Sequence, residues 1–260
     1  MPRTLPIALL SLSLAIPAAA RAEGIALRYD VYAGGTFAVA MEAEVQIAPT
    51  AYQLGAALEL GGMYALVHDW DLQATVTGAI AGDALLPIRF AKQQEGGERW
   101  AELDFAGGTL ASARGNPPPE SEDNSAVPDA LKAAAVDPLT AIVDVLRQVA
   151  VTGACAGETI VYDGKEYFSI SRVDLGRADA PQSRYGAYAG PALLCRITVD
   201  DDAPYGEVAD DARTAEIWLA QPIAGSLYVP VRIETETKYG AVRVHLTDFW
   251  SVSGETAGVQ

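Results

Sequence analysis

The sequence is short of cations, histidine and cysteine. Its 260 residues include 34 Asp and Glu against 18 Lys and Arg, and only two histidines and two cysteines. Proteins that bind nucleic acid need a basic surface to neutralise phosphates, so this balance argues against a nucleic-acid partner. It also argues against adhesion to anionic lipid surfaces. The acidity itself is typical of a soluble, exported protein.

The sequence also lacks the short motifs of common enzymes. It contains no GxSxG nucleophile elbow, no phosphate-binding loop, no dinucleotide fingerprint and no CxxC pair. Carboxylates are numerous, but in an acid-rich chain many pairs arise by chance, so spacing assigns no glycosidase pair. We therefore expect a protein that is not an enzyme and has no cofactor.

A long apolar run occurs only at the N-terminus. Arg3 precedes the apolar run 5–17, and Ala20-Arg21-Ala22 fits the small-x-small rule for signal peptidase. The run is too short to span a membrane, and an uncleaved anchor is the alternative. No later segment reaches 18 uninterrupted apolar residues. We expect a signal peptide over residues 1–22, cleaved after Ala22, and a periplasmic protein that does not span the membrane.

The two cysteines, Cys155 and Cys195, are 40 residues apart. A small, even number of cysteines in an oxidising compartment indicates a disulfide, which would stabilise the fold by about 4 kcal/mol in the chain-entropy model. Two buried thiols are the alternative. A zinc site is poorly supported, because His68 and His245 are distant in sequence and show no zinc-ligand spacing.

Residues 137–149 have the pattern of an amphipathic helix. Asp137 can cap its first turn, Pro138 suits the first helical position, and Gly153 is a stop signal. Apolar residues at helical spacing predict one buried stripe, formed by Leu139, Ile142, Val143, Leu146 and Val149. This stripe needs an apolar partner, and the rest of the chain offers only β-sheet.

Most of the remaining chain alternates between apolar and polar residues, which is the period of β-strands. The run 36–47 predicts a strand of roughly 40 Å, a length typical of wide curved sheets or barrels. Short Gly-rich turns separate about eleven to thirteen predicted strands and indicate antiparallel neighbours. We predict a mainly β fold, with a large curved antiparallel sheet (an open half-barrel or barrel-like) and one main amphipathic helix at about 137–149.

The proline-rich stretch 115–128 is typical of an exposed loop that leads into the helix. We expect a single β-rich domain over residues 23–260. Two smaller β domains divided near this loop are the alternative.

Two polar clusters are candidates for chemistry. The sequence HDWD at 68–71 has catalytic residue types, but a polar bend between strands explains it as well. Asp200, Asp201 and Asp202 offer the hard oxygens that Ca²⁺ prefers. Their spacing does not match an EF-hand loop, and a solvated hairpin tip is the favoured interpretation. We assign no catalytic residue and no metal site.

Several predicted strands carry small residues on one face, among them Ala38, Ala40, Gly55 and Ala57. Small side chains on a curved sheet either leave room for a ligand or allow the helix to pack tightly. If there is a cavity between sheet and helix, its candidate lining comprises Phe37, Val39, Met41, Leu54, Leu58, Leu139 and Leu146.

Six segments, in order along the chain, carry a family resemblance. They are YDVYAGG at 29–35, LLPIRF at 85–90, DPLTAIVDVLRQV at 137–149, YDGKEYF at 162–168, YAGPALLC at 188–195 and VPVRIETETKYGAVRVHL at 229–246. Together they resemble the exported proteobacterial proteins grouped as domain of unknown function 3108, from which no catalytic residue is carried over. The predicted architecture is also similar, more distantly, to the periplasmic lipoprotein-carrier half-barrels, in which a curved sheet wraps around helices and holds acyl chains.

Three functional hypotheses follow. The leading one is a non-enzymatic periplasmic protein that binds a lipid or another hydrophobic or amphiphilic envelope component in a cavity between sheet and helix. The alternative is a protein-interaction or structural factor in envelope assembly, with a packed core and a binding surface on its loops. The third, a cell-wall hydrolase, requires a cleft in which His68 or carboxylates converge.

Overall fold

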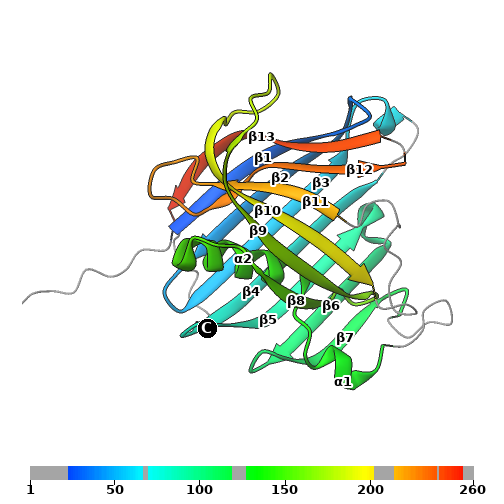
Figure 1. Cartoon of the computed structure of the whole chain (residues 1–260). Helices are drawn as coiled ribbons and strands as arrows, with labels where there is room; N and C mark the ends of the chain where they lie inside the picture. Colours follow the sequence, from blue (N-terminus) through cyan, green and yellow to red (C-terminus); the bar gives the residue numbers. More distant parts are fainter. Residues whose placement is uncertain (1–22, 67–69, 119–126, 202–213, 239, 254–260) are drawn as a thin grey trace, which may run out of the picture.

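The computed structural model describes residues 23–66, 70–118, 127–201, 214–238 and 240–253. Within these ranges, thirteen strands form one antiparallel sheet accompanied by two α-helices (Figure 1). The mainly β fold predicted from the sequence is therefore confirmed. No helix in the described ranges is long and apolar enough to cross a membrane.

The strands vary from six to fourteen residues in length. They are β1 (Glu23–Ala33), β2 (Thr36–Ile47), β3 (Ala51–Leu60), β4 (Asp71–Ala81), β5 (Ala84–Gln94), β6 (Arg99–Ala106), β7 (Thr109–Asn116), β8 (Gly157–Tyr162), β9 (Tyr167–Ala180), β10 (Gly190–Asp201), β11 (Thr214–Ala220), β12 (Val229–Thr237) and β13 (Gly240–Ser253). The helices are α1 (Asp129–Lys132) and α2 (Pro138–Thr152), and the short 3-10 turns are η1 (Tyr64–Leu66) and η2 (Glu95–Gly97).

The order of the strands across the sheet is β7-β6-β5-β4-β3-β2-β1-β13-β12-β11-β10-β9-β8. Almost every strand pairs with its neighbour in the chain, as short turns between antiparallel strands require. The one exception is the pairing of β1 with β13, which joins the beginning and the end of the described chain at the centre of the sheet. The edges of the sheet are therefore β7 and β8, which border the α-helical segment.

The two edges approach each other without pairing. The turn between β8 and β9 reaches the concave side of β5 and β6, where Asp163 forms an ion pair with Lys92. Gly164 comes so close to β6 that a Cβ at this position would lie 2.8 Å from the Cβ of Ala101. Its φ of +97° is also one that glycine adopts at little cost. The sheet thus curls past itself through side-chain contacts and is not closed by a hydrogen-bonded ladder.

Helix α2 lies against the concave face of β3, β4 and β5 and also contacts β8 (Figure 1). The predicted cap and stop residues are confirmed, and the helix continues to Thr152, beyond the predicted end at 149. The Asp137 carboxylate accepts hydrogen bonds from the backbone N–H groups of Leu139 (3.0 Å) and Thr140 (2.9 Å). Gly153 ends the helix in the left-handed conformation. Its buried apolar residues include Leu139, Ala141, Val143, Leu146 and Val149.

The prediction that Ile142 belongs to the buried stripe is wrong, because its side chain is 42% exposed. The helix is turned so that Thr140 faces the sheet, where its hydroxyl lies 2.8 Å from the Tyr52 hydroxyl. Residues two apart on a helix point about 200° away from each other. Burial of Thr140 therefore directs Ile142 to solvent.

Cys155 and Cys195 form a disulfide, as predicted, with their Cα atoms 6.3 Å apart. Both side chains are buried. The bond connects the segment after α2 to β10. At the other end of the helix, Val136 pairs with β8 through hydrogen bonds of its N–H to Ile160 and of its carbonyl to Tyr162. The helix is therefore held at both ends to the last strands of the sheet.

Candidate functional site

The concave face of the sheet has a closed part beneath α2. One row of cross-strand neighbours runs through it, and every side chain in the row is at most 3% exposed: Ile25, Val45, Leu54, Val76, Phe90 and Leu103. The apolar residues of α2 complete the same packed cluster. The predicted lining residues Leu54, Leu139 and Leu146 lie here, in core packing. Side chains fill the space directly beneath the helix, where the leading hypothesis predicts a cavity, because α2 fits into the concavity.

A buried chain of hydroxyl and carboxyl groups holds α2 on β3. The Thr140 hydroxyl donates to the second Asp137 oxygen (2.5 Å) and lies within hydrogen-bonding distance of Tyr52. Burial raises the pKa of the Asp137 carboxyl above its ordinary value, although the hydrogen bonds from Thr140 oppose this shift. None of the three side chains is more than 3% exposed. The chain is inaccessible to a substrate and acts as a structural contact.

Farther along the same strands, the concave face carries apolar side chains that are only half-buried. We call these residues on β1 to β4 the half-buried apolar region, and they are Val31, Val39, Met41, Leu58, Leu60 and Leu72. These residues lie on the concave face, the same face that α2 covers at the other end of the strands. Strand register shows this, because they alternate in phase with the core residues of the same strands. The corresponding side chains of β11, β12 and β13, namely Ile217, Ile233 and Val244, are half-buried too. The predicted lining residues Val39, Met41 and Leu58 come together in this region.

A polar hollow continues this region toward β6. Leu72 stands opposite Gln94, and Gln94 stands opposite Arg99. The hollow has a volume of about 270 Å³ and lies between β5 and β6 on one side and the turn between β8 and β9 on the other. The residues that line it are Lys92, Gln94, Arg99, Trp100, Ala101, Asn116, Pro117, Asp163, Gly164, Lys165 and Glu166. The concave face therefore changes from apolar to charged along one row. Sequence reasoning missed the hollow, because its two walls come from segments that are far apart in the chain, up to Pro117 and from Asp163 onward, and no motif connects them.

Phe37 lies away from the other predicted lining residues. The β1–β2 register shifts between Val31 and Tyr32, so that Phe37 stands opposite Tyr32 rather than facing the concave side. The two rings are 5.8 Å apart. A β-bulge of this kind inserts one residue and reverses the alternation beyond it. The prediction assumed unbroken alternation through residues 36–47, and it therefore assigned Phe37 to the wrong face.

The same outer side holds a cluster of aromatic rings around His245. Tyr32 lies 4.3 Å from Tyr185 and 5.7 Å from His245, measured between ring centroids. Tyr185 belongs to the connection between β9 and β10, which hydrogen-bonds to β13 through the N–H of Ala187 and the carbonyl of Leu246 (2.7 Å). Burial lowers the pKa of the His245 imidazole, and the neighbouring Arg232 guanidinium lowers it further. These contacts attach the connecting loop to the sheet.

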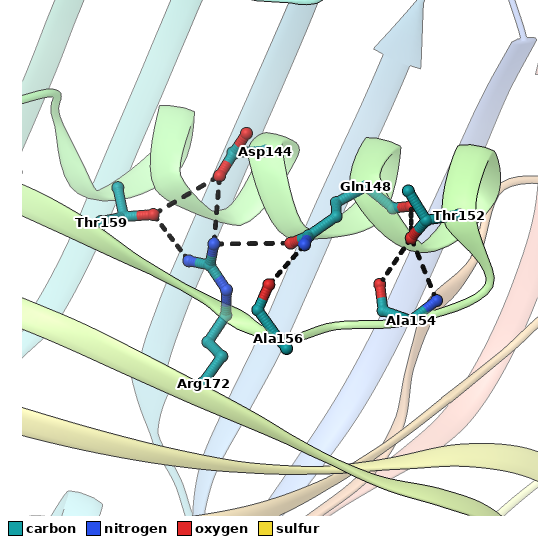
Figure 2. Close-up of polar contacts among 7 residues, drawn as sticks. All are labelled: Asp144, Gln148, Thr152, Ala154, Ala156, Thr159 and Arg172. Carbon is teal, nitrogen blue, oxygen red and sulfur yellow. Dashed lines mark hydrogen bonds and ion pairs between the residues drawn. The ribbon is translucent and has the colours of Figure 1, made fainter.

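A second polar network joins α2 to the strands that follow it, as Figure 2 shows. The Arg172 guanidinium donates to the Thr159 hydroxyl (2.6 Å) and pairs with the Asp144 carboxylate (3.3 Å). It also reaches the Gln148 side chain, whose amide donates to the carbonyl of Ala156. The Arg172 side chain is only 3% exposed, and no described residue forms a hydrogen bond with its Nε. This arrangement fixes the exposed flank of the helix to β8 and β9.

The other predicted polar sites lie partly outside the described residues. This applies to His68, Asp69 and Asp202, whereas Asp200 and Asp201 form the end of β10. In the part of the chain that the structure describes, no three His, Cys, Asp or Glu residues are grouped so as to hold a metal ion.

Fold and site together define a barrel-like, mainly β protein whose concave face is half closed by a helix. Residues 28–247 match the model of the family described as "Protein of unknown function (DUF3108)", and the chain belongs to this family. The comparison with curated proteins gave no match.

Solved structures include one that is similar in fold. It is titled "Crystal Structure of Beta-barrel-like Protein of Domain of Unknown Function DUF1849 from Brucella abortus". The alignment has a TM-score of 0.51 at 9% sequence identity and covers 89% of this chain and 99% of that one. At this identity the similarity concerns the architecture alone.

Proposed function

We propose that the protein is a non-enzymatic periplasmic binding protein that holds the acyl chain of an amphiphile against the half-buried apolar region. One observation carries the proposal: a concave face lined by Leu, Val and Met remains half-buried beside a part that α2 closes completely. Ligand sites are concave and mostly apolar, with a few polar groups at defined places. The disulfide supports the periplasmic assignment, because such bonds persist in oxidising compartments.

The dimensions and energetics suit an acyl chain. From Met41 on β2 to Arg99 on β6 the row crosses four strand spacings, or roughly 19 Å. Each methylene that leaves water contributes about 0.8 kcal/mol. Ten such groups would contribute about 8 kcal/mol before the cost of association is subtracted, which is sufficient for reversible binding.

Native mass spectrometry tests the proposal directly. The protein would be purified from periplasm, measured without denaturation and then extracted with organic solvent. We expect an additional lipid-sized mass on the folded protein and recovery of the same molecule in the extract. If the protein carries no such mass and also fails to bind an added fluorescent fatty acid, the proposal is wrong.

A pair of variants locates the binding. Leu58→Asn places an amide in the half-buried apolar region, whereas Leu66→Asn changes a residue on η1 that is 84% exposed. We expect Leu58→Asn to weaken binding of the fluorescent fatty acid at least tenfold, because a buried amide without a partner is costly. Leu66→Asn should bind like the unmodified protein.

A second candidate function is docking to a protein partner, which the 3-10 turn η1 favours. Met63 and Leu66 are 71% and 84% exposed, and Tyr64 between them is also exposed. Large apolar side chains grouped on a surface indicate an interaction site. A pull-down from periplasmic extract with the double variant Met63→Ser/Leu66→Ser as control tests this function. A partner captured equally by both proteins would rule out docking through η1.

A further inference from the structure

The polar hollow of about 270 Å³ lies where the half-buried apolar region ends. We propose that this hollow binds the anionic headgroup of the amphiphile, with Arg99 as the principal contact. The inference rests on the proposed function, since the headgroup belongs to the molecule whose chain occupies the apolar region.

Strand register makes the half-buried apolar region and the polar hollow direct neighbours on the concave face. Leu58 stands opposite Leu72, Leu72 opposite Gln94, and Gln94 opposite Arg99. Side chains directly opposite each other on one face of a sheet have Cβ atoms about 5 Å apart. A chain lying on Leu58 and Leu72 therefore brings its polar end to Gln94 and Arg99.

The charges in the hollow single out Arg99. Lys92 is paired with one Asp163 oxygen, and the other Asp163 oxygen accepts hydrogen bonds from the N–H groups of Lys165 and Glu166 (2.8 Å each). Lys165 lies 3.9 Å from the Glu166 carboxylate. The Arg99 side chain, in contrast, has no hydrogen-bond or ion-pair partner among the described residues. The guanidinium is thus the cation of the hollow that is available to a ligand.

The lining carries three cations and two acids, which gives 3 − 2 = +1. This local excess of positive charge occurs in a chain whose net charge is −16. A guanidinium presents a planar fork of donors that matches the two oxygens of a carboxylate or a phosphate. The chemistry expected of the ligand is therefore an acyl chain that ends in an anionic oxygen group. A fatty-acid carboxylate and a lysophospholipid phosphate both satisfy it.

Binding measurements with three amphiphiles of one chain length test the inference. The probes are palmitate, palmitoyl-lysophosphatidylglycerol and the uncharged 1-monopalmitoylglycerol, each below its critical micelle concentration. They would be titrated against the unmodified protein, Arg99→Gln and the control Arg177→Gln, which removes an exposed arginine that does not line the hollow. The expected loss in Arg99→Gln is about fivefold in affinity for an anionic probe, the upper end of what a solvent-exposed ion pair supplies.

The outcomes separate the headgroup inference from the proposed function. We expect at least one anionic probe to bind more tightly than monopalmitoylglycerol, and this advantage to disappear in Arg99→Gln but persist in Arg177→Gln. Preference for palmitate or for the lysophospholipid identifies which anionic group is recognised. Equal binding of all three probes, or an unchanged preference in Arg99→Gln, would overturn the headgroup inference while acyl binding stands. If none of the three probes binds, the proposed function itself fails.

Discussion

The two parts of the concave face use the same residue types with different results. Under α2, Leu54 and its neighbours are almost fully buried and determine stability. A few residues farther along the same strand, Leu58 and Leu60 remain half-buried. The difference arises because α2 contacts β3, β4 and β5, which have 10 or 11 residues, at only one of their ends. A single helix that fits into a wide sheet thus creates a core and leaves an apolar surface beside it.

The largest expected effect concerns the disulfide that holds the segment after α2. The double variant Cys155→Ala/Cys195→Ala should lose about 4 kcal/mol of unfolding free energy, because the unfolded chain regains the freedom of a 40-residue loop. Urea denaturation measures this loss, and reduction of the unmodified protein should reproduce it. A loss below about 1 kcal/mol would mean that the closed part holds α2 without the bond.

Matched truncations test the comparison itself. Leu146→Ala removes a side chain that is 2% exposed in the closed part and should lower the unfolding free energy by about 3 kcal/mol. Leu58→Ala removes the same atoms from the half-buried apolar region and should cost only about 1 kcal/mol while weakening acyl binding. Equal losses of stability in urea denaturation would show that the two parts do not differ as described.

The Arg172 network of Figure 2 should respond asymmetrically. Asp144→Ala leaves a buried guanidinium without its carboxylate and should lower the unfolding free energy by about 2 kcal/mol. This is less than the loss expected for a fully buried pair, because the Asp144 side chain is 44% exposed. Arg172→Met removes the charge together with the Nε that lacks a partner, and it should cost less than Asp144→Ala. Thermal unfolding of both variants decides the order, and the reverse order would show that the pair is a net source of stability.

The smallest effect is a dependence on pH that arises outside both parts. The His245 imidazole has a lowered pKa in the folded protein, so between that value and its ordinary pKa the unfolded chain binds the proton more readily. Stability should therefore fall as the pH decreases through about 6.5, by at most about 1.4 kcal/mol per pH unit. The charged groups facing His245 are Arg232 and Arg243, which lower its pKa, and Glu234 and Asp30, which raise it.

His245→Gln should flatten this acid-side slope in urea denaturations between pH 5.5 and 8. Acyl binding at pH 7.5 should be unchanged, because His245 lies opposite Asp30 on the outer side of the sheet. An unaltered slope would show that other groups cause the acid sensitivity. A loss of acyl binding in His245→Gln would contradict the placement of His245 outside the concave face.

Local interactions explain why much of the fold follows from the sequence. The cap at Asp137, the stop at Gly153 and the alternation of the strands each depend on residues close together in the chain, so helix α2 and the mainly β architecture are predictable from them. Because the chain contains only two cysteines, a disulfide within it could form only between Cys155 and Cys195, and the structure contains this bond.

The tertiary structure decided which faces these elements present. The contact between Tyr52 and Thr140, 88 residues apart, set the rotation of α2 and exposed Ile142. A bulge placed Phe37 on the outer side, which no alternation pattern reveals. Above all, curvature brought the turn at Asp163 to Lys92 and Arg99 and so formed the polar hollow. Helix caps and strand periods are local properties, whereas the meeting of two distant sheet edges depends on how far thirteen strands together curl.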